Sequence, residues 1–139
     1  MEVKRLFYGD ASSIGEARVF VRDALAETDA PADVVDCAVL LVSELAANVT
    51  LHARTEVRVT VRVEDEALWA EVKDWSSRLP HACLAPGDAT SGRGLRLVEA
   101  IASRWGVERD DDGKVVWFVL RLDHPPGSNG RSAASSPSD

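Results

Sequence analysis

Hydrophobic and polar residues alternate along several segments of the chain, which is the pattern of strands with one buried face. The strictest alternation covers Glu56–Glu64, where valine occupies every second position from Val57 to Val63. The residues Asp65–Glu66 and the sequence Asp-Asp-Gly at 111–113 each predict a turn between strands. The segments predicted to be strands are Val3–Tyr8 (an edge strand), Glu56–Glu64, Ala67–Asp74, Arg104–Asp110 and Lys114–Leu122.

Three other segments carry helix signals. Ser13 and Glu16 form a capping-box signature ahead of the first predicted helix, Ile14–Thr28. Pro31 opens a longer helix that runs to about Ala53, and a short helix follows at residues 94–103. The resulting order, β-α-α-β-β-α-β-β, predicts the α+β class. We expect a two-layer sandwich in which helices pack on one face of a mixed, mostly antiparallel sheet.

Two segments fall outside this pattern. Trp75–Gly92 is a loop of about 18 residues, and loops of that length tend to be lids or binding loops. From His124 to Asp139, Ser, Pro and Gly dominate, and such a composition cannot bury enough apolar surface to fold. We therefore expect one domain at residues 1–123 and a disordered tail at residues 124–139.

Composition narrows the classes of function. The 139 residues carry a net charge of −7, and all of that excess lies before the tail, which argues against non-specific nucleic-acid binding. Neither a signal peptide nor an uninterrupted apolar run of membrane-spanning length is evident, so a cytoplasmic protein without a membrane partner is expected. The two cysteines, Cys37 and Cys83, match no metal-binding or disulfide spacing.

Glu44, Asn48 and His52 interrupt the apolar second helix at four-residue intervals. Each four-residue step turns the side chain by about 40°, so the three groups form a slanting row at the border of the buried stripe. Asn is a mediocre residue inside a helix because its amide competes for backbone hydrogen bonds. The row is either an ordinary polar border or a set of groups that binds Mg²⁺ and supplies a base.

Gly92 and Gly94 stand just before the third predicted helix. Glycine permits close approach of the backbone to a ligand, and a helix N-terminus favours phosphate. Arg93 and Arg96 add cationic donors. This segment is either a phosphate-binding turn or a glycine-rich helix start without a ligand. Asp74, at the end of a strand, could accept a hydrogen bond from the amine of a base or make an ordinary turn contact.

Together these segments resemble the GHKL (Bergerat-fold) ATPases, and among them the small anti-sigma-factor serine kinases of bacteria. The resemblance covers about residues 12–122 and lies in three motifs that follow one another in the family's order. They are SELAANVTLHA (Ser43–Ala53), VKDWSSRLP (Val72–Pro80) and GRGLRLVEAIASRWGV (Gly92–Val107). The order of helices and strands is also similar. The resemblance implies the Bergerat fold, with ATP and Mg²⁺ bound.

The family's roles carry over to matching positions. Glu44 matches the general base, Asn48 matches the magnesium ligand, and Asp74 matches the aspartate that receives the adenine amine. His52 matches a frequent histidine, for which packing and phosphate contact are both open. The positions implied to contact the nucleotide are Asn48, His52, Asp74, Ser76, Thr90, Ser91, Gly92, Arg93, Gly94 and Leu95.

The chain also departs from the family's pattern. Ser76 and Arg78 replace the two glycines that usually follow the aspartate. Val115 occupies the position where the last strand of the family often carries a small hydroxyl near adenine. Trp75, which lies in the second motif, is expected beside the base. These departures leave two functions open. One is an ATP-dependent protein serine kinase, and the other is a binding module of the same fold with weak or no nucleotide binding.

The partners follow from the resemblance as well. The kinase would phosphorylate an anti-sigma-factor antagonist and sequester a sigma factor. The resemblance also implies a homodimer, and it implies no direct contact with nucleic acid.

Overall fold

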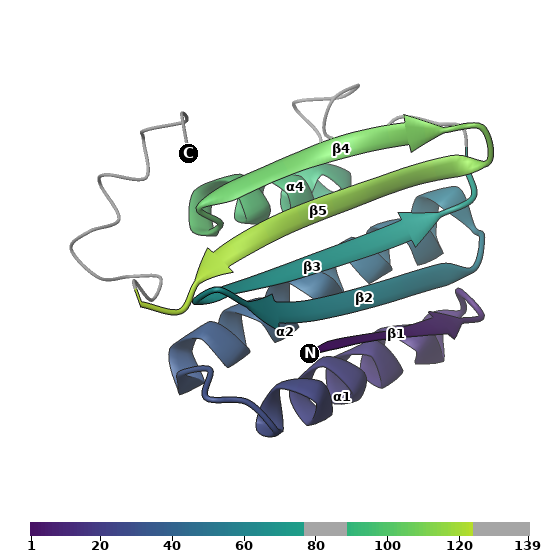
Figure 1. Ribbon diagram of the computed structural model, residues 1–139. Coiled ribbons are helices and arrows are strands. Elements are labelled where there is room, and N and C mark those ends of the chain that lie inside the picture. Colours follow the sequence, from purple (N-terminus) through teal and green to yellow (C-terminus); the bar gives the residue numbers. More distant parts are fainter. Residues whose placement is uncertain (77–88, 124–139) are drawn as a thin grey trace.

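A computed structural model describes residues 1–76 and 89–123, and for residues 89–94 it describes the backbone only. Five strands form one sheet in the order β1-β2-β3-β5-β4 (Figure 1). The strands are β1 (Glu2–Phe7), β2 (Val57–Glu64), β3 (Ala67–Asp74), β4 (Arg104–Asp110) and β5 (Gly113–Arg121). The helices are α1 (Ala11–Ala26), α2 (Ala32–Asn48), its π-helical extension η1 (Val49–Ala53) and α4 (Ala89–Ile101). The predicted α+β class and the order of elements are confirmed.

All four pairings in the described sheet are antiparallel, where a mixed sheet was expected. The connections explain this arrangement. Helices α1 and α2 carry the chain away and back, so β2 starts at the end where β1 finishes and runs in the opposite direction (Figure 1). Helix α4 returns the chain once, so β4 runs in the direction of β3. Strand β5 then enters by a hairpin and pairs between them.

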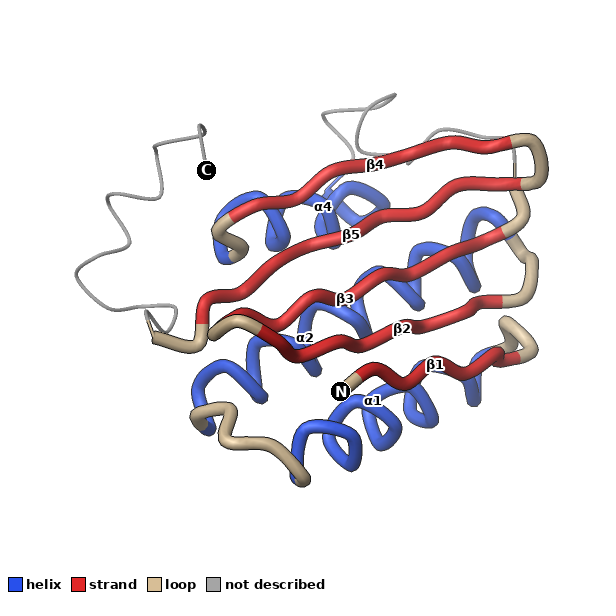
Figure 2. Tube along the Cα trace, viewed as in Figure 1, coloured by secondary structure: helices blue, strands red, loops and turns tan. Residues whose placement is uncertain are grey.

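The helices cover one face of the sheet only (Figure 2). The core lies between this face and the helices, and strand alternation supplies its residues. Val57, Val59 and Val61 of β2 are fully buried, as are Leu68 of β3 and Phe118 of β5. No helix of the described residues covers the opposite face, which we call the open face.

The first helix begins earlier than the sequence indicated. Asp10 is its N-cap, and one carboxylate oxygen accepts hydrogen bonds from the Ser13 backbone N–H at 3.2 Å and the Ser13 hydroxyl at 3.1 Å. The Ser13 hydroxyl accepts in turn from the Gly9 N–H at 2.9 Å. The predicted capping box of Ser13 and Glu16 is therefore wrong, because Ser13 already belongs to the first turn of α1. Aspartate satisfies a free N–H at this position as well as serine does.

Helix α2 with η1 forms one helical segment, Ala32–Ala53. By length and composition this segment could cross a membrane. The sequence had predicted no membrane span here, because polar residues interrupt the apolar run. In the structure it packs against the sheet between α1 and α4, and half of its most apolar window is buried (Figure 1). A core helix passes the same test of length and composition, so this observation is weak support for a membrane span.

Candidate nucleotide site

The flanks of α2 face different helices. Arg22 of α1 lies 3.3 Å from Asp36 of α2, which marks the flank that faces α1. Ser43 lies on that flank as well, and its side chain is buried. Glu44 and Asn48 occupy the other flank, and α4 packs on that side of α2 (Figure 1). The two residues with proposed catalytic and magnesium roles are thus half-buried and face α4.

Past Asn48 the helix widens into the π-helical turn η1. The Arg54 N–H donates to the Val49 carbonyl at 2.7 Å, and Arg54 then ends the helix in the left-handed conformation with φ of 58°. A π turn contains more residues than an α turn, so His52 rotates less far toward the core than an α-helix would carry it. His52 is half-buried and stays closer to the line of Glu44. The sequence did not predict this turn, and single π turns often occur at functional sites.

Asp74 ends β3 with its side chain on the helix-covered face, since it follows the buried Ala70 and Val72 at two-residue intervals. Its carboxylate is held by Lys114 of β5, whose Nζ lies 2.9 Å from Oδ2 and 3.1 Å from Oδ1. The two side chains are only 7% and 6% exposed. Asp74 Oδ1 also accepts the Ser76 N–H at 2.8 Å. The residue expected to receive the adenine amine thus forms a buried ion pair.

Lys114 is a buried partner of Asp74 that the sequence did not predict. Strand β5 pairs with β3 so that Asp74 faces Lys114 and Lys73 faces Val115. Val115 therefore lies on the open face, and the expectation that it stands near adenine is wrong by one position. Since neighbouring strand residues point to opposite faces, a shift of one residue moves a side chain from the face of Asp74 to the open face. Counting back from the hairpin at 111–113 could have found this register.

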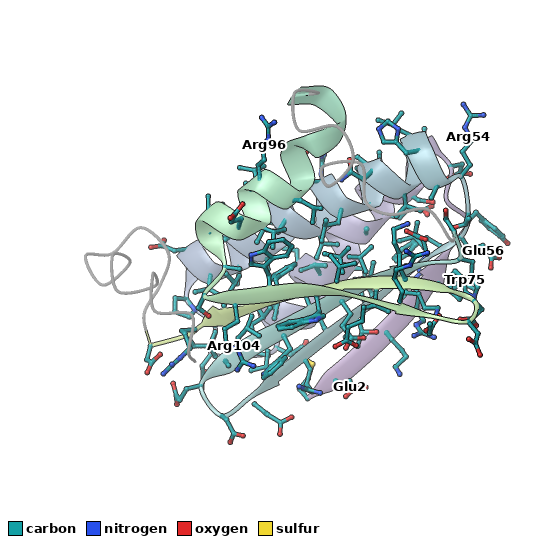
Figure 3. All side chains as sticks on the ribbon, turned by 90° about the horizontal axis from the view of Figure 1, so that it is seen from above. Glu2, Arg54, Glu56, Trp75, Arg96 and Arg104 are labelled. Carbon is teal, nitrogen blue, oxygen red and sulfur yellow. The ribbon has the colours of Figure 1, made fainter. Side chains whose placement is uncertain are left out.

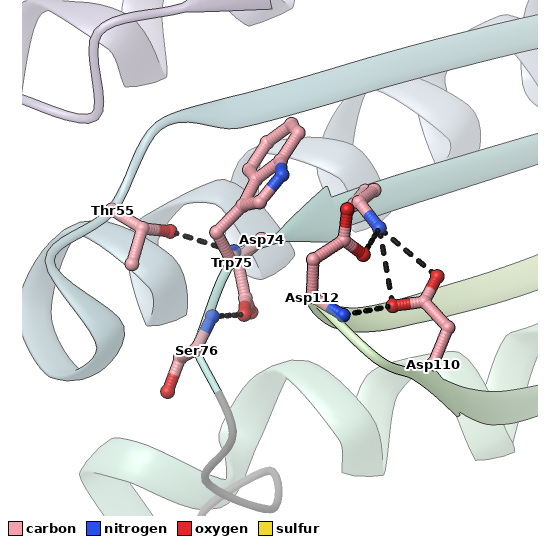
Figure 4. A network of polar contacts seen from close by, with 7 residues as sticks. Thr55, Asp74, Trp75, Ser76, Asp110 and Asp112 are labelled. Atoms are coloured by element: carbon pink, nitrogen blue, oxygen red, sulfur yellow. Dashed lines mark hydrogen bonds and ion pairs between the residues drawn. The ribbon is translucent and has the colours of Figure 1, made fainter.

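Trp75 also lies away from the expected place. Lys73 Nζ sits 5.2 Å from the centre of the Trp75 ring and pairs with Asp110 and Asp112, each at 3.0 Å. These contacts place the indole with the open-face charges. The Trp75 N–H donates to the Thr55 hydroxyl at 3.1 Å, which ties the end of β3 to the segment that follows η1 (Figure 4). This bond connects the second expected motif to the segment just after the first.

Two charged contacts set the pKa values on the open face. Hydrogen bonding from Asp112, and then from Lys73, lowers the pKa of Asp110 to about 2. Burial alone would lower the pKa of Lys73, but its hydrogen bonds to Asp112 and Asp110 outweigh burial and raise it. Both pKa shifts favour the charged forms, so Lys73 and Asp110 stay ionised near neutral pH.

Helix α4 also begins earlier than expected. It starts at Ala89, so Gly92 and Gly94 lie inside its first two turns and not in a turn before it. Thr90, Ser91 and Arg93 belong to the same turns, and their side chains fall outside the described part. A helix interior accepts glycine at a cost of about 1 kcal/mol each, so the chain can begin its helix ahead of them.

Other residues of α4 are better defined. The side chain of Leu95 is 4% exposed and belongs to the core, so any contact with a nucleotide would come from its backbone. Arg96 is exposed and points away from the sheet (Figure 3). Ser76 is buried beside Asp74, whereas Arg78 and most of the expected lid, residues 77–88, lie outside the described residues.

The oxygen groups of this face suit magnesium bound together with phosphates. Asn48 and Glu44 carry hard oxygen donors, which Mg²⁺ prefers. Among the described residues, no three His, Cys, Asp or Glu side chains gather into a metal-binding group. Nucleotide-bound Mg²⁺ needs one or two protein oxygens besides phosphates and waters. The oxygen donors of Asn48 and Glu44 therefore fit a metal that arrives with a nucleotide.

Comparisons with known proteins agree with this geometry. No curated protein matches the chain. A solved structure of the RsbU and RsbW domains of Rv1364c from Mycobacterium tuberculosis aligns with a TM-score of 0.70 at 19% identity, over 88% of this chain and 32% of that one. The histidine kinase domain of a blue-light activated histidine kinase from Erythrobacter litoralis aligns with a TM-score of 0.55 at 20% identity, over 91% and 64%.

The two structural similarities show the fold, because their sequence identities are low. This chain spans about a third of the first solved chain and less than two thirds of the second. The family described as "Histidine kinase-like ATPase domain" matches residues 7–120, from the end of β1 nearly to the end of β5. The chain therefore belongs to the histidine kinase-like, GHKL-type ATPase family.

Proposed function

We propose that the protein binds ATP with Mg²⁺ between α2, α4 and the end of β3, and that it is a protein serine kinase. Its substrate is an anti-sigma-factor antagonist, and it also sequesters a sigma factor as a homodimer in the cytoplasm. One observation carries the nucleotide site: α2, whose flank away from α1 bears Glu44 and Asn48, packs beside α4 on the face of the sheet that holds Asp74. Family membership and the similarity to a chain with an RsbW domain support the regulatory part.

The residues have separate tasks in this proposal. Asp74 accepts a hydrogen bond from the adenine amine, and backbone N–H groups at the start of α4 face the phosphates. The Asn48 amide oxygen holds Mg²⁺, which when bound neutralises charge on the phosphates. The serine oxygen of the antagonist bonds to the γ-phosphorus as the bond to the ADP oxygen breaks. Glu44 accepts the serine proton. Phosphoryl transfer needs few other catalytic groups, because positioning and charge neutralisation supply most of the rate enhancement.

The test separates nucleotide binding from chemistry. Titration calorimetry with ATP should detect binding that requires Mg²⁺ and is lost in Asn48→Ala. With labelled ATP and a purified anti-sigma antagonist, Glu44→Ala should stop transfer while ATP binding is largely retained. Glu71→Ala, an exposed carboxylate on the open face, is the matched control and should transfer at the wild-type rate. Transfer that survives Glu44→Ala would exclude the assigned base.

A second candidate is a binding module of the same fold that has lost catalysis. The observation that favours it is the ion pair at Asp74, since Lys114 already contacts both carboxylate oxygens. Such a module would regulate a partner by contact alone. It predicts no detectable heat with millimolar ATP, with or without Mg²⁺, and no transfer to any antagonist.

A further inference from the structure

The ion pair at the end of β3 offers a donor and an acceptor side by side. Asp74 and Lys114 are directly opposite each other on neighbouring strands, on the face that the helices cover. Ser76 N–H fixes one carboxylate oxygen, and Gly113 packs against the backbone of Asp74. A Cβ at Gly113 would lie 2.0 Å from the Asp74 carbonyl oxygen, so β5 approaches this point closely. The Asp74 carboxylate is therefore held by a main-chain N–H, and the Lys114 ammonium is held by that carboxylate.

The pair keeps hydrogen-bonding capacity. A carboxylate has about four acceptor sites, and the contacts of Asp74 with described residues are Ser76 N–H once and Lys114 twice. One acceptor site on Oδ2 remains. An ammonium has three N–H donors. The contacts of Lys114 with described residues go to the two oxygens of Asp74, which leaves one donor. The remaining acceptor and donor are neighbours.

Adenine presents the complementary pair along one edge. Its exocyclic amine donates, and the adjacent ring nitrogen N1 accepts. We infer that Lys114 recognises the base together with Asp74. The Lys114 ammonium donates a hydrogen bond to N1, while Asp74 accepts a hydrogen bond from the amine. This inference rests on the proposed nucleotide site and adds to it a second recognition residue from β5. It gives the buried lysine a role besides balancing the charge of Asp74.

A base analogue separates this role from a structural one. In 1-deaza-ADP a C–H group replaces N1, while the amine that Asp74 would accept is unchanged. Binding of ADP and 1-deaza-ADP with Mg²⁺ is measured by calorimetry on the full chain. Wild type should bind the analogue about tenfold more weakly, the usual effect of losing one hydrogen bond to a charged donor. Lys114→Met should bind ADP about tenfold more weakly and should no longer distinguish the two ligands.

Lys73→Met is the matched control. It makes the same chemical change one residue before Asp74, but on the open face, so the ratio of the two affinities should equal that of wild type. Lys114→Arg keeps the charge and serves if Lys114→Met does not fold. It should retain part of the discrimination, and the wild-type comparison needs no variant. Circular dichroism and thermal melting check that each variant is folded.

The outcomes are distinct. If wild type binds ADP and 1-deaza-ADP equally, or if Lys114→Met still distinguishes them, Lys114 does not read the base. ADP binding that becomes tighter in Lys114→Met would show instead that the lysine competes for Asp74, and it also overturns the inference. If wild type binds no adenine nucleotide, the proposed function fails and this inference fails with it.

Discussion

Lys73 and Asp74 are neighbours in sequence, and both form ion pairs, but the pairs lie on opposite faces of the sheet. On the helix-covered face, both partners are buried, with Asp74 and Lys114 at 6% and 7% exposure. On the open face, Lys73 is also only 7% exposed, yet Asp110 and Asp112 remain 53% and 67% exposed. The two pairs thus differ in the solvation of the carboxylates and not in distance, since all are near 3.0 Å.

This difference in solvation gives the two ion pairs different effects on stability. A carboxylate that stays in water gains little from its cation, and breaking such a pair returns it to solvent. A carboxylate that is buried with its cation depends on it, because removal of the cation leaves a charge without solvent. The open-face pair ties the β4–β5 turn to β3, whereas the buried pair sits where a nucleotide base is proposed to bind. Four predictions test this contrast, from the largest expected effect to the smallest.

Lys114→Met should lower the free energy of unfolding by about 3–5 kcal/mol, because Asp74 stays buried without its cation. Urea denaturation followed by circular dichroism measures the change. The double variant Asp74→Asn with Lys114→Met removes both charges and should recover much of the loss. Equal stability of the single and double variants would contradict the dependence of Asp74 on Lys114.

Gly113→Ala should cost about 1–3 kcal/mol, as expected for overpacking. The added Cβ would meet the Asp74 carbonyl oxygen at 2.0 Å, so the backbone of β3 must move. The comparison is Gly106→Ala on the open face, where the Cβ would meet the Trp117 ring at 2.8 Å. A side chain can shift more easily than a strand, so Gly106→Ala should cost less. Chemical denaturation of both variants tests the order, and the reverse order would be evidence against it.

Lys73→Met should lower the melting temperature by much less than Lys114→Met. The methionine can still cover the Trp75 ring, and the two carboxylates it leaves behind are already half in water. Differential scanning calorimetry of the two lysine variants in the same buffer makes the comparison. A loss as large as that of Lys114→Met would mean that the open-face pair is as dependent on its cation as the buried one.

Asp110 should give the smallest effect, and this effect should disappear in acid. Because its folded pKa is about 2 and its ordinary value is 3.8, the stabilisation is complete above pH 3.8 and is lost as the pH falls toward about 2. Melting temperatures of wild type and Asp110→Asn should therefore differ at neutral pH and converge over this interval. A difference that stays constant down to pH 2 would rule out the charged pair as its source.

Much of the fold could be predicted from the sequence. The turn signals at 65–66 and 111–113 predicted Ala67–Asp74 and Arg104–Asp110, and the structure has both strands at these bounds, because such turns limit where a strand can begin or end. Helix starts were harder to place, because Asp10 and Ser13 are both good capping residues and only the packed structure selects one. The antiparallel arrangement depended on where each helix returns the chain, which residue patterns do not encode.

For the candidate site too, the sequence determined some features and the tertiary structure decided others. The residue types alone left Glu44, Asn48 and Asp74 open between a site and ordinary polar contacts, and the resemblance of three ordered motifs to the GHKL ATPases selected the site. Tertiary structure placed α4 beside Glu44 and Asn48. It also put Lys114 rather than Val115 on the face of Asp74. The physical reason is that the period of a strand is two residues. Composition and spacing determine which residues can do chemistry, while the register between β3 and β5 decides which of them share a face.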